Sequence, residues 1–396
     1  MTGPSPQQIV IVGASAAGVS AAMALRDQGY AGRLTLVDAQ PHLPYERPPL
    51  SKKVLTLPDE EPSWLYPAQE YSHKAIDLRL GLRAQRLQEG AVHLDNGEAL
   101  PFDRLLIATG VAARQWPGQM QMQGTHVLRS WDDALRLRHH LRQAQRVVVI
   151  GAGVLGCEVA ASARSLGLHV TLIDPQPVPM QRQLGPVLGG LLADLHRAQG
   201  VDLLCATGVQ RLLAQDGRFA GVQTGDGRTL AADLLVVAIG AAPSTDWLQG
   251  SGLDLREGVV CDAYCRAADG IYAAGDVARW TCVHSGKLRR VEHRMHAAEQ
   301  GAHAAANMLG VQQVFDPTPF FWTDQYQVKI QGYGFVEEGD EPVVAAGELQ
   351  SGRFVMAFVG QDRINALVGW NAARDLRLLR NRIGLPRAQL AAPQGA

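Results

Sequence analysis

The chain lacks the features of several large classes of protein. Its 396 residues hold five cysteines, and no two of them have C-x-x-C spacing. It contains no uninterrupted apolar run of about 20 residues, so a membrane-spanning helix is not expected. The formal net charge is −1, so no overall basic bias favours nucleic acid. The opening residues, MTGPSPQQ, carry no positive charge, so no signal peptide is expected and a cytoplasmic location is predicted.

The spacing of the cysteines does not favour a metal centre. Cys261 and Cys265 form a C-x-x-x-C pair, but no further ligands follow at zinc spacing. Cys157 falls inside an expected helix and is interpreted as a small buried residue. No metal site is predicted.

One pattern occurs twice in the chain. Residues 9–38 and 147–174 each contain an apolar strand, a glycine-rich turn, an alanine-rich helix, a second strand and a final acid. This is the dinucleotide-binding fingerprint. The second copy is complete, whereas the first has Ser15 in place of the middle glycine. Two such copies in one chain indicate two nucleotides held face to face, the geometry for moving electrons between cofactors.

Each position of the fingerprint has a physical role. The first glycine makes the turn, the small second residue lets a pyrophosphate approach the backbone, and the third glycine lets the helix pack closely on the strand. These positions are Gly13, Ser15 and Gly18 in the first copy, and Gly151, Gly153 and Gly156 in the second. The pyrophosphate would lie at the helix N-terminus. Asp38 and Asp174 are expected to accept hydrogen bonds from ribose hydroxyl groups.

A second repeat follows each fingerprint. Asn96-Gly97 and Asp226-Gly227 are hairpin signals, and each is followed at the same spacing by an apolar strand that closes on Gly110 or Gly240. The chain therefore contains two copies of one architecture, with the second expected as an insertion in the first. Its length allows two or three domains with full cores.

Three further motifs point to a family. They are PYERPPLSK at residues 44–52, IYAAGDV at 271–277 and FWTDQY at 321–326. With the two fingerprints, they make the chain resemble the FAD-dependent NADH:ferredoxin reductases of bacterial oxygenase systems, from Ile9 to about Ile383. The resemblance implies an α/β fold with two Rossmann-like dinucleotide-binding domains, as in glutathione-reductase-like flavoproteins, plus a C-terminal α+β domain.

The family organisation also assigns the domains. A discontinuous FAD-binding domain would span residues 5–113 and 235–315, an NAD-binding domain residues 114–234, and a ferredoxin-reductase-type C-terminal domain residues 316–396. The residues alone leave the order open, since either fingerprint suits either dinucleotide.

The resemblance implies two sets of cofactor-binding residues. The FAD set is Gly13, Ser15, Ala16, Gly18, Asp38, Arg47, Lys52, Ala84, Thr109, Gly110, Arg129, Gly275, Asp276, Arg294 and Trp322. The NAD set is Gly151, Gly153, Val154, Leu155, Gly156, Glu158, Asp174 and Gly240.

Lys52 and Glu158 are the residues expected to take part in catalysis. In the family, the matching lysine lies beside the flavin ring and pairs with the matching glutamate, where a cation stabilises developing negative charge. The residues alone favour a solvated loop lysine and an acid at a helix N-terminus.

Asp276 would bind the ribityl chain of FAD or be an acidic turn residue. Relatives often carry an aromatic residue and an asparagine where this chain has Arg294 and His296; an arginine there would favour flavin reduction.

Nucleotide choice and electron acceptor follow from further residues. Asp174 favours NADH over NADPH, because a carboxylate repels a 2′-phosphate; Arg182 is the nearest arginine that follows.

The implied partner is a [2Fe–2S] ferredoxin that serves a cytochrome P450 or a ring-hydroxylating oxygenase. An expected helix over Ala372–Ile383 carries four arginines, which suit docking of an acidic ferredoxin or a solvated helix face equally. Trp322 would shield the flavin, assist electron passage or fill the core.

Two other functions compete with ferredoxin reduction. A disulfide or persulfide reductase needs a reactive cysteine beside its flavin, and none lies between Asp38 and Lys52. A redox-sensing flavoprotein like apoptosis-inducing factor would hold NADH in a long-lived complex. The protein is expected to be a monomer or a weak homodimer.

Overall fold

The computed structural model describes residues 6–282 and 286–390. The expectations for the first residues and for the end of the C-terminal domain concern in part residues 1–5 and 391–396, which lie outside the described residues. The chain forms two compact units. Unit 1 takes the described residues up to Arg47 together with Pro62–Ala112 and Ala241–Pro317; unit 2 takes Pro48–Glu61, Ala113–Gly240 and the described residues from Thr318.

A six-stranded sheet forms the centre of unit 1. Its order is β19 (Arg266–Ala268), β20 (Ile271–Ala273), β7 (Arg104–Ile107), β1 (Gln8–Val12), β2 (Arg33–Asp38) and β3 (Ile76–Leu80). All neighbours are parallel except β19 and β20. The central strands are short apolar runs buried on both faces, as parallel sheets require. Because β20 returns to pair with β7 after the second fingerprint, the expected insertion is confirmed.

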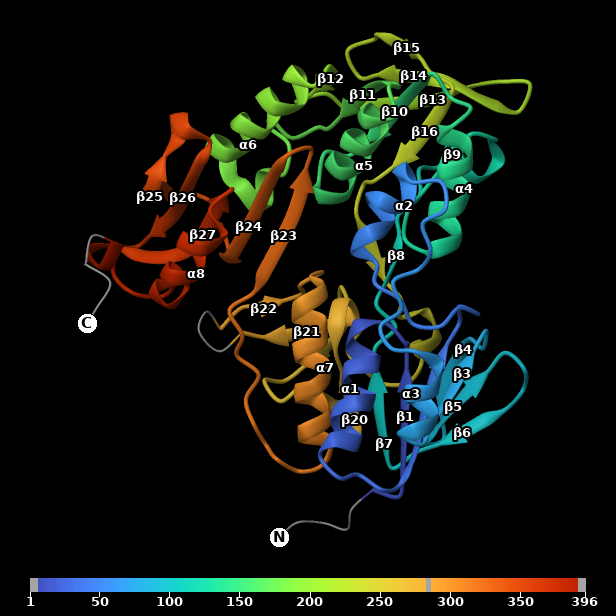
Figure 1. Cartoon of the computed structure of the whole chain (residues 1–396). Helices are drawn as coiled ribbons and strands as arrows, with labels where there is room; N and C mark the ends of the chain where they lie inside the picture. Colours follow the sequence, from blue (N-terminus) through green and yellow to red (C-terminus); the bar gives the residue numbers. More distant parts are fainter. Residues whose placement is uncertain (1–5, 283–285, 391–396) are drawn as a thin grey trace. The chain divides into compact units, whose positions relative to one another are not determined.

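Two helices lie side by side in unit 1, α1 (Ala16–Asp27) and α7 (Arg294–Met308) (Figure 1). Small residues allow the close approach: a Cβ on Gly301 would lie 2.1 Å from the backbone oxygen of Ala17. Helix α7 lies within the alanine-rich segment of residues 291–310.

Smaller elements complete unit 1. They are the ribbon β4 (Ala84–Gln88), β5 (Ala91–Leu94) and β6 (Ala99–Pro101), the sheet β18 (Val259–Cys261), β21 (Ala278–Thr281) and β22 (Leu288–Arg289), the pair β8 (Val111–Ala113) and β17 (Ala241–Pro243), and the helix α3 (Ala68–His73). Asn96-Gly97 forms the expected hairpin turn between β5 and β6, with Gly97 at φ +87°.

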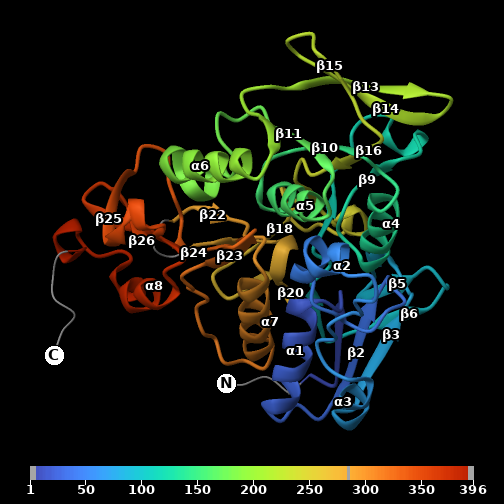
Figure 2. The same cartoon turned by 45° about the horizontal axis from the view of Figure 1, so that its top comes forward.

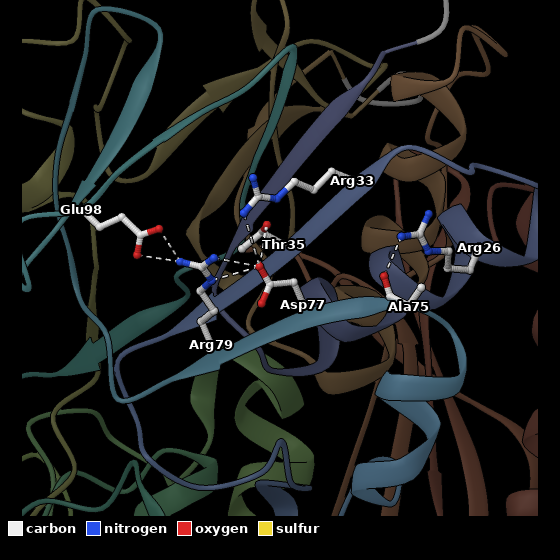
Figure 3. A network of polar contacts seen from close by, with 7 residues as sticks. All are labelled: Arg26, Arg33, Thr35, Ala75, Asp77, Arg79 and Glu98. Atoms are coloured by element: carbon white, nitrogen blue, oxygen red, sulfur yellow. Dashed lines mark hydrogen bonds and ion pairs between the residues drawn. The ribbon is translucent and has the colours of Figure 1, made fainter.

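Charged side chains fasten the edge strand β3 (Figure 3). Asp77 of β3 accepts a hydrogen bond from Thr35 of β2, and Arg79 bridges Asp77 to both carboxylate oxygens of Glu98 at 2.6 Å. Arg26, near the end of α1, donates to four backbone carbonyls, one of them on Ala75. These bonds tie the edge of the sheet to its helix and to the adjoining ribbon.

The part of unit 2 that carries the second fingerprint contains a parallel five-stranded sheet. Its order is β12 (Val201–Leu204), β11 (His169–Ile173), β10 (Arg146–Ile150), β16 (Leu234–Val237) and β9 (Thr125–His126). The helices of this part are α2 (Lys53–Thr56), α4 (Trp131–Leu141), α5 (Val154–Ser165) and α6 (Gln181–Ala198). The ribbon β13 (Val209–Gln215), β14 (Arg218–Thr224) and β15 (Thr229–Ala231) packs on the sheet through Phe219 and Val222 (Figure 2).

An antiparallel sheet forms the C-terminal part of unit 2. Its order is β23 (Phe320–Gln325), β24 (Val328–Gly334), β27 (Arg363–Trp370), β26 (Arg353–Gly360) and β25 (Glu341–Glu348). The helix expected over Ala372–Ile383 is shorter: α8 covers Ala373–Leu379 and passes into a 3₁₀ turn at Arg380–Arg382. Helix α6 packs on this sheet, where Gly185 interrupts its helical backbone beside the ring of Phe358.

Among the described residues, no helix combines the length and the hydropathy that crossing a membrane would require.

Candidate functional site

The two fingerprints fold into the same local structure, one in each unit. In unit 1, Gly13 N–H donates to Val37 at 2.7 Å; in unit 2, Gly151 N–H donates to Ile173 at 2.8 Å. A Cβ on either glycine would lie within 2.3 Å of the carbonyl oxygen of the residue that follows the neighbouring strand, and both glycines have positive φ. Only glycine fits these turns.

The acid that closes each fingerprint orders its own loop. Asp38 accepts from Ala14 N–H at 2.6 Å and from Gln40 N–H at 2.8 Å, one bond to each carboxylate oxygen. Asp174 accepts in the same way from Ala152 at 2.6 Å and Gln176 at 2.7 Å. Each oxygen keeps a free lone pair, so the carboxylate can also accept from a ribose hydroxyl.

The ends of both helices fit a dinucleotide phosphate. Neither α1 nor α5 has a side-chain cap at its N-terminus, so first-turn N–H groups remain for an anion. A Cβ on Gly153 would meet no atom within 4 Å, which leaves room at the middle position of the second fingerprint.

A pocket lies beside the first fingerprint. Ser15 accepts a hydrogen bond from Arg47 Nε at 3.2 Å, which holds this arginine at the end of α1. The pocket is lined by Ala14, Ser15, Asp38, Gln40, His42, Leu43, Pro44, Tyr45 and Arg47. A cationic side chain, a helix N-terminus and a ribose acceptor converge here, and they suit the phosphate and ribose of FAD.

The Gly275-Asp276 motif lies against the first fingerprint. A Cβ on Gly275 would stand 2.9 Å from the Cβ of Ala17, and Gly275 N–H donates to the buried Gln300 side chain at 2.8 Å. Thr109 donates to the Ser244 carbonyl at 2.9 Å, and Gly110 has a positive φ of 66°. Unit 1 therefore contains Arg47 of the RPPLSK run, the ATG turn and the GD motif together with the first fingerprint.

Lys52 and Glu158 form an ion pair within unit 2. Lys52 Nζ lies 2.8 Å from Glu158 Oε2, and the glutamate side chain is 6% exposed. Ser51 Oγ donates to the same oxygen at 2.5 Å, and Thr323 Oγ1 donates to Oε1 at 2.6 Å. Because the buried carboxylate has a cation and two hydroxyl donors, its charge is compensated. The predicted pairing of Lys52 with Glu158 is confirmed.

Arg294 is paired in a way that the sequence did not predict. Its guanidinium contacts both oxygens of Glu46, at 2.9 and 2.5 Å, which raises the pKa of Arg294. The glutamate offsets the positive charge, so the expected effect of an unpaired cation on flavin reduction is weakened. His296 is buried between the rings of Trp280 and Phe315.

The remaining predicted residues are spread over both units. Ala84 begins β4 in unit 1, whereas Arg129 precedes α4 and Gly240 follows β16 in unit 2. Trp322 is half-buried in β23, and its ring stacks on Phe320 with a centroid distance of 6.0 Å.

The sequence did not reveal the neutral partners of Glu158. Ser51 stood out only as part of a motif, and Ser162, which donates to the Ser51 carbonyl at 2.6 Å, did not stand out at all. Thr323 and Gln325 could have been noticed in the sequence. They are polar, yet they alternate along one strand with Phe321 on the same face, which marks that face as the buried one.

The cysteines are poor candidates for redox chemistry. All five thiols are free, and Cys157 is fully buried, as predicted. Burial raises the pKa values of Cys157, Cys205, Cys261 and Cys265, which disfavours their reactive thiolates.

Comparisons with known proteins agree with this geometry. The family model described as pyridine nucleotide-disulphide oxidoreductase matches residues 7–301, and the one described as reductase C-terminal matches residues 320–394. Rhodocoxin reductase of Rhodococcus erythropolis is 38% identical, with 93% of this chain and 87% of the relative covered. The anthranilate 1,2-dioxygenase system ferredoxin–NAD(+) reductase component of Burkholderia cepacia is 37% identical, covering 96% and 94%.

A solved structure is also similar over nearly its whole length. The ferredoxin reductase for the CYP199A2 system from Rhodopseudomonas palustris superposes with a TM-score of 0.93 at 30% identity, covering 98% of this chain and 97% of that one.

Proposed function

Because the chain belongs to the pyridine nucleotide-disulphide oxidoreductase family, we propose that it is a cytoplasmic, FAD-dependent NADH:ferredoxin reductase. Its acceptor is a [2Fe–2S] ferredoxin that serves a cytochrome P450 or a ring-hydroxylating oxygenase. The names of the relatives support the ferredoxin and the nucleotide. The ion pair between Lys52 and the buried Glu158 is the observation that carries the proposal, because it holds a cation beside an NAD-type fingerprint.

In this proposal the two fingerprints bind different nucleotides. Residues 5–113 and 235–315 bind FAD, residues 114–234 bind NADH, and residues 316–396 complete the reductase. Bound FAD supplies the chemistry, since it accepts a hydride and releases electrons singly. The protein contributes binding, orientation and charge: Arg47 and the end of α1 face the phosphates, Asp38 and Asp276 accept from hydroxyl groups, and Lys52 provides positive charge.

The fingerprint acid selects NADH. Both oxygens of Asp174 are held by backbone N–H groups, so the carboxylate cannot easily turn away from a 2′-phosphate. No arginine occurs in residues 175–179, and Arg182 is exposed. These features support a preference for NADH over NADPH.

The C-terminal arginines support ferredoxin docking. Arg374, Arg377 and Arg380 are exposed on α8 and the turn that follows it. The nearby acid Asp375 pairs instead with Arg353 at 3.4 Å. Exposed arginines can steer an acidic ferredoxin through long-range attraction.

An anaerobic titration tests the function. The yellow protein is mixed with NADH or NADPH, and the flavin absorbance is followed before an oxidised [2Fe–2S] ferredoxin is added. NADH is expected to bleach the flavin, and the ferredoxin is expected to restore the colour as it is reduced. A flavin that NADH leaves oxidised would refute the proposal. A persistent long-wavelength band without electron transfer would favour a redox sensor, and two new thiols after reduction would favour a disulfide or persulfide reductase.

A further inference from the structure

Strand β23 buries polar residues where a strand normally buries apolar ones. Phe321, Thr323 and Gln325 point to the buried face, and the two polar members are both 0% exposed. The other face carries the half-buried Trp322 and Asp324. Burying a hydroxyl and an amide costs free energy unless each finds a partner, so the partners indicate what these side chains do.

The partner of Thr323 is Glu158. Thr323 Oγ1 donates to Glu158 Oε1 at 2.6 Å, whereas the other carboxylate oxygen is occupied by Lys52 and Ser51. Among the described residues, Thr323 is the one hydrogen-bond donor to Oε1. It lies 165 residues from Glu158 and belongs to β23 of the C-terminal sheet, whereas Glu158 belongs to helix α5.

Gln325 fixes the direction of the threonine hydroxyl. Its Nε2 donates to Thr323 Oγ1 at 3.1 Å, and an amide N–H can only donate. The threonine oxygen therefore accepts from Gln325, and its single proton remains for Glu158. The result is a one-way chain of donors that ends on the carboxylate.

A buried histidine interacts electrostatically with Gln325. His196 of α6 is 0% exposed, and its Nδ1 lies 3.0 Å from the hydroxyl of Tyr326. Burial lowers the pKa of His196 to about 4, an effect that the Gln325 side chain partly opposes. The His196 ring is therefore neutral and does not compete with Lys52 as a second cation for Glu158.

We propose that Thr323 is a positioning residue for Glu158, with its hydroxyl directed by Gln325, so that strand β23 of the C-terminal sheet holds the Lys52–Glu158 pair in place. The proposal rests on the function proposed above. It gives the C-terminal sheet a part in the nicotinamide site in addition to any part in docking a ferredoxin.

Loss of the hydroxyl has a defined electrostatic consequence. A hydrogen bond donated to a carboxylate favours the ionised form. Without it, Oε1 of Glu158 loses its hydroxyl donor, and the carboxylate is held less firmly beside Lys52. A residue with a merely structural role would lower the stability and leave flavin reduction and NAD+ binding unchanged.

Two readouts test the positioning role in the FAD-containing protein. One is the rate constant of flavin reduction by NADH; the other is the dissociation constant of NAD+ measured by calorimetry, which requires no turnover. Both are followed from about pH 5 to about pH 9. Thr323→Val is expected to slow reduction by roughly tenfold, the size of one lost hydrogen bond to a charged group, and to weaken the binding of NAD+.

Matched variants distinguish the effect of the Thr323 hydroxyl on Glu158 from a general effect on the packing of the protein. Thr323→Ser keeps the hydroxyl and is expected to stay within about twofold of the parent protein. Thr224→Val makes the same chemical change at another fully buried threonine, whose hydroxyl donates to the Asp226 carboxylate at the end of β14, and should leave both profiles unchanged. Thr323→Ala replaces the valine variant if the latter does not fold.

A double-mutant cycle with Glu158→Gln tests whether Thr323 acts through Glu158. If Thr323 acts through Glu158, Thr323→Val shifts neither profile in the Glu158→Gln protein. A full effect in that background, or equal losses in the serine and valine variants, overturns the proposal. If NADH does not reduce the parent protein, the function proposed above fails, whereas the NAD+ binding cycle still decides the role of Thr323.

Discussion

At the scale of single residues, His296 makes stability depend on pH. Its ring is 2% exposed, and neither of its nitrogens has a hydrogen-bond partner among the described residues. Burial lowers its pKa to about 3; His293 adds to this shift, and Asp276 opposes it. An unfolded histidine binds a proton below about pH 6.5, so the unfolded chain holds more protons between the two values. The contribution of the neutral, buried His296 to the free energy of unfolding is therefore fully present above about pH 6.5 and decreases as the pH falls below that value.

Replacing His296 with phenylalanine should flatten this dependence. Urea unfolding is measured at several values from about pH 7 to about pH 4, where one such histidine contributes up to about 1.4 kcal/mol per pH unit. His296→Phe keeps an aromatic ring between Trp280 and Phe315 and removes the titrating group. His169→Gln changes an exposed histidine and should keep the original slope. An unchanged slope in His296→Phe would show that the buried ring does not control it.

At the scale of elements, the close contact between α1 and α7 limits the size of the side chain that position 301 of α7 can accommodate. A Cβ on Gly301 would meet backbone atoms of Ala17, which no side-chain rotation relieves. Gly301→Ala is expected to cost about 1–3 kcal/mol of unfolding free energy through overpacking and to weaken FAD retention, since α1 carries the first fingerprint. Thermal unfolding and the flavin content of the purified protein measure both effects.

A second helical glycine provides the control for this contact. A Cβ on Gly190 in α6 would meet no atom within 4 Å, and the φ of this glycine is not positive. Gly190→Ala should stabilise the protein by about 0.5–1 kcal/mol, because alanine loses less backbone entropy on folding. Equal losses in both variants would mean that helix contact is not the limiting factor at Gly301.

At the scale of the whole molecule, the two fingerprints should fail separately. Gly13→Ala would place a Cβ 2.1 Å from the Ala108 oxygen, and Gly151→Ala would place one 2.3 Å from the Ala238 oxygen. The first variant is expected to lose FAD and its yellow colour. The second should stay yellow but resist bleaching by NADH. The absorption spectrum before and after anaerobic NADH reports both results, and the opposite pattern would reverse the assignment of the two cofactors.

Much of this architecture could be predicted from the sequence because the signals are local. The turns at Gly13 and Gly151 and the hairpin at Asn96-Gly97 depend on backbone sterics and short-range periodicity. The end of the C-terminal helix was less well predicted, since the 3₁₀ turn at Arg380–Arg382 replaces its last turn. Helix ends are set by weak local preferences that tertiary packing overrides.

The sequence by itself determined that two nucleotide-binding folds occur in this chain and which glycines and acids build them. Only the tertiary structure decided the surroundings of the charged residues. Glu158 receives bonds from residues 107 and 165 positions away, and Arg294 pairs with Glu46 across 248 positions. A turn needs only its own few residues, whereas a buried charge needs partners brought from distant segments by the packing of sheets and helices.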